Sequence, residues 1–323
     1  MTTTASPPSP TAPAATSDDD ATLSLLAASY LHSPQHLHTY VLPQFRHRLT
    51  LMSQFAIPAG SKILELGCGQ GETTLVLAHL VGPTGHVTGV DPARLDYGHP
   101  ITVSAARAHI LSSALGGRIA FHATDPHAYL EALPAGQGFD FVILSHSLWY
   151  FSSKTAVLES LVALRPYAPR LLVAEYSFEG RLGEQRPHVL AARCQAVFYD
   201  AKTAEQRAAT EPNVRAAPAP AEVKEMAGRA GWGVVRREGM VTPGEDVKDG
   251  QWEVSWVCFY KQFWDEVEGV LGGKEGVKRE VERLKRETRG ELERVNREAG
   301  VAGEEDVSRC RTMDVWWAEF ERV

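Results

Sequence analysis

The sequence predicts a doubly wound α/β fold, in which helices cover both faces of a mostly parallel sheet. Short apolar runs typical of buried strands alternate with longer helix-like segments through the middle of this 323-residue chain. A glycine-rich stretch at residues 65–72 follows the first of these runs and precedes a helix-like segment. Such alternation requires βαβ crossovers, which place helices on both sides of a parallel sheet.

The N-terminal part is expected to precede the sheet. Residues 1–20 consist of Thr, Ser, Pro and Ala followed by three Asp, which predicts a disordered tail. Residues 21–58 form a predicted N-terminal helical segment, because apolar residues between 37 and 55 recur at the spacing of one helix face.

The alternating core is expected at residues 59–260, with a cap inserted at about 180–222. Strand-like and helix-like runs follow each other in regular order. We expect strands at 62–66, 87–90, 119–124, 139–144, 171–174, 234–241 and 253–259, and helices at 73–80, 103–115, 127–133, 155–164, 186–198 and 223–230.

Residues 261–323 are expected to form a charged C-terminal helical extension. Sixteen of the twenty-five residues at 274–298 are charged, and a thin apolar stripe runs through them. This pattern predicts a solvated helix docked by one edge. Residues 311–320 are expected to form a final packed element.

Composition excludes several classes of protein. With 33 basic and 40 acidic residues the formal charge is -7, which disfavours binding to a nucleic-acid backbone. No apolar run approaches the length of a membrane span. Four scattered cysteines and the absence of a signal-peptide pattern indicate a reduced, cytoplasmic protein.

The glycine-rich stretch points to a bound ligand. Gly67, Gly69 and Gly71 permit a tight turn and a close approach of the backbone to a small molecule. In a dinucleotide-binding fingerprint the third glycine stands at position 72, where this chain has Glu72. Carboxylates at Glu65 and Glu72 repel a diphosphate and tolerate a cationic ligand.

Two later carboxylates lie where a nucleoside binds. Asp91 ends the second predicted strand, twenty residues after Gly71, and can accept hydrogen bonds from both ribose hydroxyls. Asp125 ends the third strand and can accept from an adenine amino group, with help from the Thr124 backbone.

Through these segments the chain resembles the class I S-adenosylmethionine-dependent methyltransferases of the small-molecule type. The likeness covers about residues 59–177 and rests on Ile63-Leu-Glu-Leu-Gly-Cys-Gly-Gln-Gly71, Val87-Thr-Gly-Val-Asp91 and Asp125. It implies a Rossmann-like sheet of seven strands that ends in an antiparallel pair. It also implies S-adenosyl-L-methionine as cofactor, held by Glu65, Gly67, Cys68, Gly69, Gly71, Asp91, Pro92, Thr124, Asp125 and Ser145.

The end of the fourth predicted strand should face the reacting groups. His146 is the candidate catalytic base there, and a structural or cofactor-contacting histidine is an equally good interpretation. Because Ser145 and His146 stand where a metal-dependent enzyme carries carboxylates, no metal is expected. Tyr97 and His99 lie in a long connection after Asp91, which is a candidate lid over the cofactor or substrate, with a plain surface loop as the favoured alternative.

Two functions remain open at the level of sequence. The first is transfer of a methyl group to an oxygen or nitrogen of a small-molecule acceptor. The second is a binding protein of the same fold that holds S-adenosylmethionine without methyl transfer. The acceptor, the pathway and the oligomeric state have no signal in the sequence.

Overall fold

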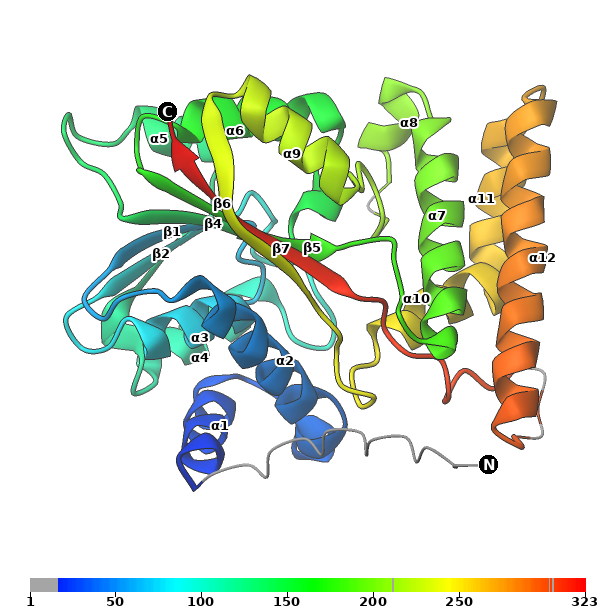
Figure 1. The fold of residues 1–323 in the computed structure, drawn as a ribbon, viewed down its shortest axis with the longest axis horizontal. Coiled ribbons are helices and arrows are strands. Elements are labelled where there is room, and N and C mark those ends of the chain that lie inside the picture. The colour runs from blue at the N-terminus through cyan, green and yellow to red at the C-terminus, as the bar shows by residue number, and fades with distance from the viewer. Residues whose placement is uncertain (1–16, 211, 302, 304) are drawn as a thin grey trace, which may run out of the picture.

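The computed structural model describes residues 17–210, 212–301, 303 and 305–323. Seven strands form one sheet in the order β3-β2-β1-β4-β5-β7-β6 (Figure 1). Their bounds are β1 Lys62–Leu66, β2 His86–Val90, β3 Ile119–His122, β4 Phe141–Ser145, β5 Arg170–Tyr176, β6 Trp232–Val241 and β7 Val315–Arg322. Strands β1 to β5 pair in parallel, and β7 pairs antiparallel with both β5 and β6.

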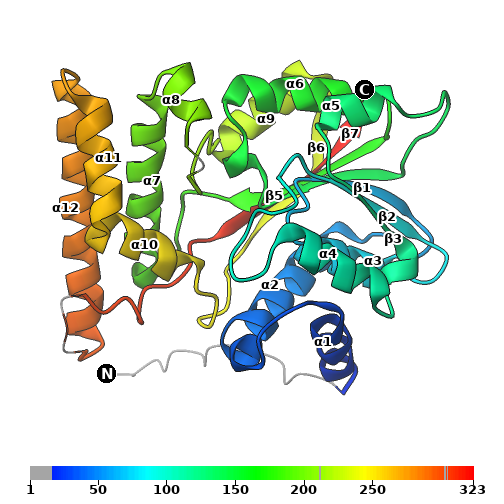
Figure 2. The same cartoon turned by 180° about the vertical axis from the view of Figure 1, so that it is seen from behind.

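Helices cover both faces of this sheet. Figures 1 and 2 show α1 to α4 on one face, and α5, α6 and α9 on the other. Their bounds are α1 Ser17–Ser29, α2 Leu42–Met52, α3 Glu72–Leu80, α4 Val103–Ser112, α5 Pro126–Glu131, α6 Lys154–Leu164 and α9 Pro220–Arg229. Strand residues alternate between the two cores: Ile63 packs with the first group of helices, and Leu64 with the second.

A separate group of helices stands beside the sheet, beyond the end of β5 (Figure 2). It consists of α7 Arg186–Asp200, α8 Ala204–Ala208, α10 Asp249–Phe259, α11 Lys261–Leu271 and α12 Glu275–Glu298. We call it the helical layer. Apolar side chains of α7, α10, α11 and α12 form their own buried cluster. None of the described helices has the length and apolar character that a membrane span requires.

The fold class is confirmed, with differences at both ends of the chain. Part of the predicted tail is ordered, because α1 begins at Ser17. Three acidic residues follow Ser17, and carboxylates in a first helical turn interact favourably with the helix dipole. The rest of the predicted tail, residues 1–16, lies outside the described residues.

The predicted strand at 253–259 is wrong. These residues belong to α10, whose buried side chains Val254, Val257 and Cys258 follow the helical spacing. The seventh strand is instead β7, within the region expected to be a helical extension. Its first six residues are buried, and it lies between β5 and β6. The sheet therefore includes residues close to the C-terminal end of the sequence. The expected boundary at 260/261 does not separate the sheet domain from a purely helical extension.

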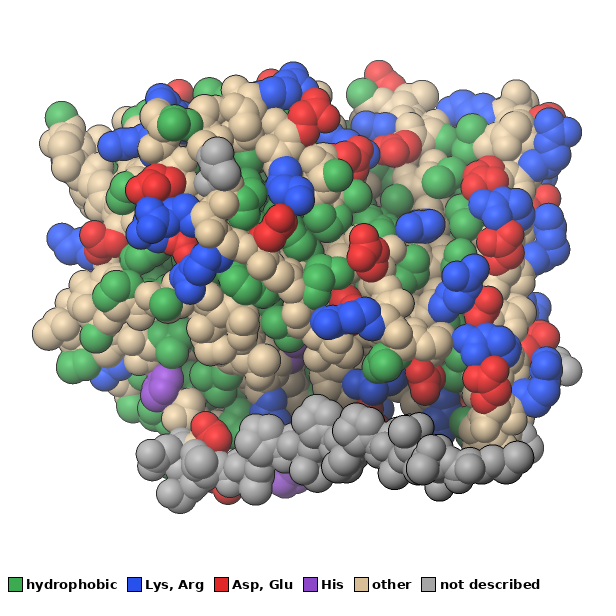
Figure 3. Space-filling view, viewed as in Figure 1, with side chains coloured by type: hydrophobic (Ala, Val, Ile, Leu, Met, Phe, Trp, Pro, Cys, Tyr) green, Lys and Arg blue, Asp and Glu red, His purple; other side chains and the backbone are tan. Residues whose placement is uncertain are grey.

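The charged segment at 274–298 is a helix docked by one edge, as predicted. Val281, Leu284, Leu292 and Val295 of α12 are buried in the helical layer. On the outer face, acidic and basic side chains alternate, and Figure 3 shows them mixed over α12 at the right edge of the molecule.

Candidate active site

A cavity of about 770 Å³ opens at the carboxyl ends of β1, β2 and β4. Most of the predicted site residues line it: Glu65, Gly67, Cys68, Gly69, Asp91, Pro92, Asp125, Ser145 and His146. Gly71 and Thr124 are not in its wall. Residues far apart in the sequence therefore converge at the edge of the sheet where ligands of doubly wound folds bind.

Glycine is needed at different positions of the loop for different structural reasons. All three glycines have positive φ angles, +76° at Gly67, +50° at Gly69 and +100° at Gly71. A Cβ on Gly71 would lie 2.6 Å from Cδ1 of Ile110, so this residue serves packing at the start of α3. A Cβ on Gly69 would meet no atom within 4 Å. Because Gly69 lines the cavity, its missing side chain leaves room for a ligand.

Asp91 and Arg107 fix the loop from two sides. One oxygen of the Asp91 carboxylate, Oδ2, accepts a hydrogen bond from the Gly69 amide at 2.8 Å, and the other accepts from the Ala93 amide at 2.8 Å. The buried guanidinium of Arg107 on α4 donates to the Gly69 carbonyl at 3.0 and 3.1 Å. Both peptide groups of Gly69 are thus held in place before any ligand binds.

Glu65 and Arg48 bring a carboxyl group and a guanidinium to the cavity wall. Glu65 is buried and accepts a hydrogen bond from Thr74 at 2.5 Å. Burial raises the pKa of Glu65 to about 7. Arg48, on α2, donates to Gln44, and its Nε atom is buried without a partner among the described residues. This end of the cavity can bind a molecule that carries both an ammonium and a carboxylate group.

The N-terminal helices reach the glycine loop. The Tyr30 hydroxyl lies 2.7 Å from a Glu72 carboxylate oxygen, to which it donates, and 3.2 Å from the Gln70 amide oxygen. The Gln70 amide nitrogen in turn donates to the Ile101 carbonyl at 2.7 Å, so the long connection after Asp91 is tied to the same loop. Tyr97 of that connection lines the cavity, whereas His99 does not.

Asp125 begins α5 as its N-cap. Its Oδ1 atom accepts hydrogen bonds from the amides of His127 and Ala128 at 2.9 and 3.1 Å. The residue is exposed and lines the cavity, so its carboxylate also faces the space that a ligand would fill.

The tip of β4 carries polar groups without partners. The hydroxyls of Ser145 and Ser147 are buried, have no hydrogen-bond partner among the described residues, and belong to residues of the cavity wall. Between them His146 has a φ of +51°, which is unusual for a residue with a side chain. Its backbone amide donates to the Ala174 carbonyl at 2.8 Å. This conformation turns the chain at the end of β4 and places the His146 ring in the wall.

The His146 ring lies between a second histidine and a carboxylate. Its Nε2 atom is 3.4 Å from Nε2 of His47, and its Nδ1 atom is 3.7 Å from Oε1 of Glu175. The carboxylate of Glu175 is fixed by the Leu148 and Tyr176 amides. The pKa of His47 lies well below its usual value, chiefly because the ring is buried and, to a smaller extent, because His146 and Arg48 are close to it. This geometry fits a single proton between the two Nε2 atoms. The other ring nitrogen of His146, Nδ1, then carries a hydrogen that is directed at Glu175.

Sequence reasoning missed Tyr30, His47, Arg48 and Arg107. His47 and Arg48 lie on α2, Arg107 lies on α4, and Tyr30 directly follows α1, at positions that no local motif marks. For the histidine and the two arginines the only signal was indirect: a basic residue beside the apolar face of a predicted helix. Their roles depend on how α1, α2 and α4 pack, which the glycine motif does not specify.

Comparison with known proteins agrees with this arrangement. A family model described as a methyltransferase domain matches residues 57–226. Methyltransferase phomM' of Diaporthe leptostromiformis is 33% identical over an alignment of 374 positions that covers 95% of this chain and 91% of the relative. A ubiquinone/menaquinone biosynthesis C-methyltransferase of Pseudomonas fluorescens is 31% identical, over 41% of this chain and 49% of its own length.

A solved structure has the same fold. It is that of a cyclopropane-fatty-acyl-phospholipid synthase-like protein from Lactobacillus casei, with a TM-score of 0.69 and 24% identity, covering 94% of this chain and 99% of that chain. With the glycine loop, the acid at the end of β2 and the seven-stranded sheet in place, these matches show that the chain belongs to the S-adenosylmethionine-dependent methyltransferase family.

Proposed function

We propose that the protein transfers a methyl group from S-adenosylmethionine to an oxygen or nitrogen atom of a small-molecule acceptor. The observation that carries this proposal is the cavity itself. Its lining includes the carboxyl group of Glu65, the guanidinium of Arg48 and the carboxylate of Asp91. It also includes Ser145 and Ser147, whose hydroxyls have no hydrogen-bond partner in the part of the chain that the structure describes. S-adenosylmethionine, an amino acid joined to a nucleoside, carries polar groups that can pair with these residues.

The residues present fit such a cofactor. Glu65 and Arg48 would bind the ammonium and carboxylate of the methionine part, against the open face of Gly69. Each carboxylate oxygen of Asp91 accepts one hydrogen bond from a backbone amide. Because a carboxylate has about four acceptor sites, both oxygens can still accept from ribose hydroxyls. Asp125 would accept from the adenine amino group, and the hydroxyls of Ser145 and Ser147, which have no partner among the described residues, would gain one.

When bound, S-adenosylmethionine supplies an electrophilic methyl group on a positively charged sulfur. The work of the protein is to hold the acceptor atom in line with that methyl group, to exclude water and to receive a proton. His146 is the group proposed to receive it. Glu175 stabilises a positive His146 ring, and His47 orients the ring through Nε2. Because Nε2 of His146 faces His47, a bound acceptor must displace His47 from this nitrogen, or His47 must accept the proton in turn.

The acceptor itself is expected to be polar. Beyond His146 the cavity is lined by Tyr150, Asn213 and Arg215, and the last two belong to the expected cap at about 180–222. The C-methyltransferase of Pseudomonas fluorescens matches only 41% of the chain, so its acceptor chemistry does not transfer here. We also propose a cytoplasmic location, which the four buried free cysteines favour.

The test is methyl transfer to a panel of small amines, phenols, alcohols and carboxylic acids, followed by formation of S-adenosylhomocysteine. Turnover with at least one acceptor is expected. Replacement of His146 by Asn, which tolerates a positive φ, should lower kcat about 100-fold or more while S-adenosylhomocysteine still binds. His99→Asn, in the connection outside the cavity wall, is the control. Cofactor binding without turnover on any acceptor would instead favour a binding protein of this fold.

A further inference from the structure

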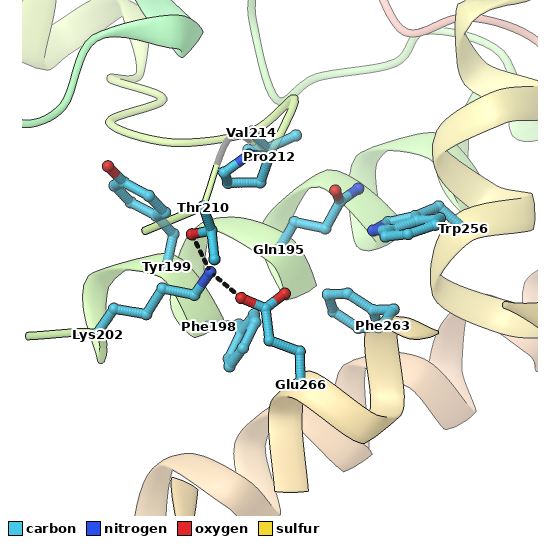
Figure 4. A pocket seen from close by; sticks show the side chains of 10 residues that line it. All are labelled: Gln195, Phe198, Tyr199, Lys202, Thr210, Pro212, Val214, Trp256, Phe263 and Glu266. Carbon is cyan, nitrogen blue, oxygen red and sulfur yellow. Dashed lines mark hydrogen bonds and ion pairs between the residues drawn. The ribbon is translucent and has the colours of Figure 1, made fainter. Parts of the chain in front are cut away.

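A second cavity of about 200 Å³ lies in the helical layer, between α7, α10 and α11 (Figure 4). Its wall includes side chains from these three helices and from the connection between α8 and α9. The lining residues are Gln195, Phe198, Tyr199, Lys202, Thr210, Pro212, Val214, Trp256, Phe263 and Glu266. We call it the helical-layer pocket.

The helical-layer pocket is separate from the catalytic cavity, although the two share a dividing segment. Thr210, Pro212 and Val214 line the pocket, whereas Asn213 and Arg215 of the same connection line the catalytic cavity. The connection is anchored at Arg215, whose amide donates to the Trp149 carbonyl at 2.8 Å. Glu253 links the two sides, accepting hydrogen bonds from Gln195 at 2.6 Å and Asn213 at 3.3 Å.

Aromatic rings form the body of the pocket. Phe198 and Phe263 meet edge to face with centroids 5.5 Å apart, and the Trp256 ring lies 6.2 Å from that of Phe263. Figure 4 shows the Trp256 ring edge, with its nitrogen, turned toward Gln195. A dry cavity of about 150 Å³ accepts benzene, so this volume accommodates one ring with a small substituent.

The polar end of the pocket is the ammonium group of Lys202. The Lys202 side chain is 1% exposed, and it contacts Glu266 at 2.5 Å and Thr210 Oγ1 at 3.0 Å (Figure 4). These contacts leave one of its three N–H groups without a hydrogen-bond partner among the residues that the structure describes. A buried N–H without an acceptor costs free energy, so the pocket favours a molecule that brings an oxygen atom to Lys202.

The same lysine disfavours a positively charged ligand, because Glu266, the carboxylate of the pocket wall, is already paired with Lys202. Its ammonium lies 4.8 Å from the Phe198 ring centroid, so the aromatic face that would attract a foreign cation already has one. We propose that the helical-layer pocket is a second binding site for a molecule with one aromatic ring and a carbonyl or carboxylate oxygen. The ring would pack among Phe198, Phe263 and Trp256, and the oxygen would accept from Lys202.

The experiment is calorimetric titration of the full chain with benzamide, benzoate and benzylamine, each with saturating S-adenosylhomocysteine. Benzamide and benzoate should bind with dissociation constants in the millimolar range or below, and benzylamine at least about tenfold more weakly, because its ammonium faces Lys202. Failure of both oxygen-bearing probes to bind overturns the proposal. So does equal binding of benzylamine.

Variants locate the site. Val214→Phe should fill the pocket and abolish binding of both probes, and Lys202→Met should weaken binding about tenfold by removing the donor. Lys285→Met is the matched control, because Lys285 also lies over an aromatic ring of the helical layer, that of Trp264, but outside the pocket. Unchanged probe affinity in both Val214→Phe and Lys202→Met would place the probes elsewhere and contradict the proposal. Normal S-adenosylhomocysteine affinity in each variant establishes that the chain is folded.

Discussion

At the scale of single residues, Asp91 illustrates how far a motif predicts a site. Its place at the end of β2 could be predicted, because the distance from the glycine loop is set by one helix and one strand. Its hydrogen bonds to the Gly69 and Ala93 amides could not, since they depend on the path of the loop. The same holds for His146: its position at the β4 tip followed from the strand, but its partner His47 comes from a helix 99 residues earlier.

Replacing Asp91 by Ala tests the proposed ribose contact. Hydrogen bonds to a charged acceptor contribute about 1.5 to 3 kcal/mol each, so S-adenosylhomocysteine should bind at least about tenfold more weakly. Titration calorimetry measures this directly. The control is Asp96→Ala, which removes an exposed carboxylate paired with Arg94 in the neighbouring connection. Equal affinities of wild type and Asp91→Ala would refute the assignment.

At the scale of elements, strands β1 to β5 and helices α3 to α6 were predictable because each is a short apolar run or a segment with an apolar helical face, bounded by turn signals. The segment 253–259 was not, because Val, Trp and Phe favour strands by propensity, while contact with α7 selects a helix here. Strand β7 was unclear for another reason. It follows the charged helix α12 and not another strand-like run, and its partners β5 and β6 lie far away in the sequence.

The glycine loop gives a prediction that separates stability from binding. Gly71→Ala should lower the free energy of unfolding by about 2 kcal/mol or more, since a Cβ would lie 2.6 Å from Ile110 Cδ1 at a strained φ. Gly69→Ala should be destabilised less, because its Cβ meets no atom of the described residues and only the φ of +50° is unfavourable, yet it should lose affinity for S-adenosylhomocysteine. Urea denaturation and calorimetry on both variants provide the comparison. The reverse pattern, with Gly69→Ala unstable and Gly71→Ala weak only in binding, would be incompatible with the loop described here.

At the scale of the whole molecule, the helical layer and the sheet are joined through buried polar contacts. His188 on α7 is fully buried, and its Nδ1 atom accepts a hydrogen bond from the Met313 amide at 2.9 Å, two residues before β7. Burial lowers the pKa of His188 to about 4. The neutral ring is therefore part of the contact that attaches the helical layer to the last strand.

This contact predicts a dependence of stability on pH. The folded pKa of His188 lies below the unfolded value of about 6.5, so its contribution is present above about pH 6.5 and is lost as pH falls toward 4, a loss of about 3 kcal/mol. His188→Gln keeps an acceptor for the Met313 amide and does not titrate. Urea denaturation between about pH 7 and pH 4.5 should therefore show a steeper loss of stability for the wild type than for the variant. Parallel pH profiles would mean that His188 is protonated in the folded protein.

The proposed function requires that the cavity at the ends of β1, β2 and β4 binds S-adenosylmethionine. The most direct measurement is calorimetric titration of the full chain with S-adenosylmethionine, S-adenosylhomocysteine and NAD in parallel. We expect micromolar binding of the first two and none of NAD, because Glu65 and Glu72 repel a diphosphate. Binding of NAD, or failure of both sulfur-containing nucleosides to bind, would contradict it.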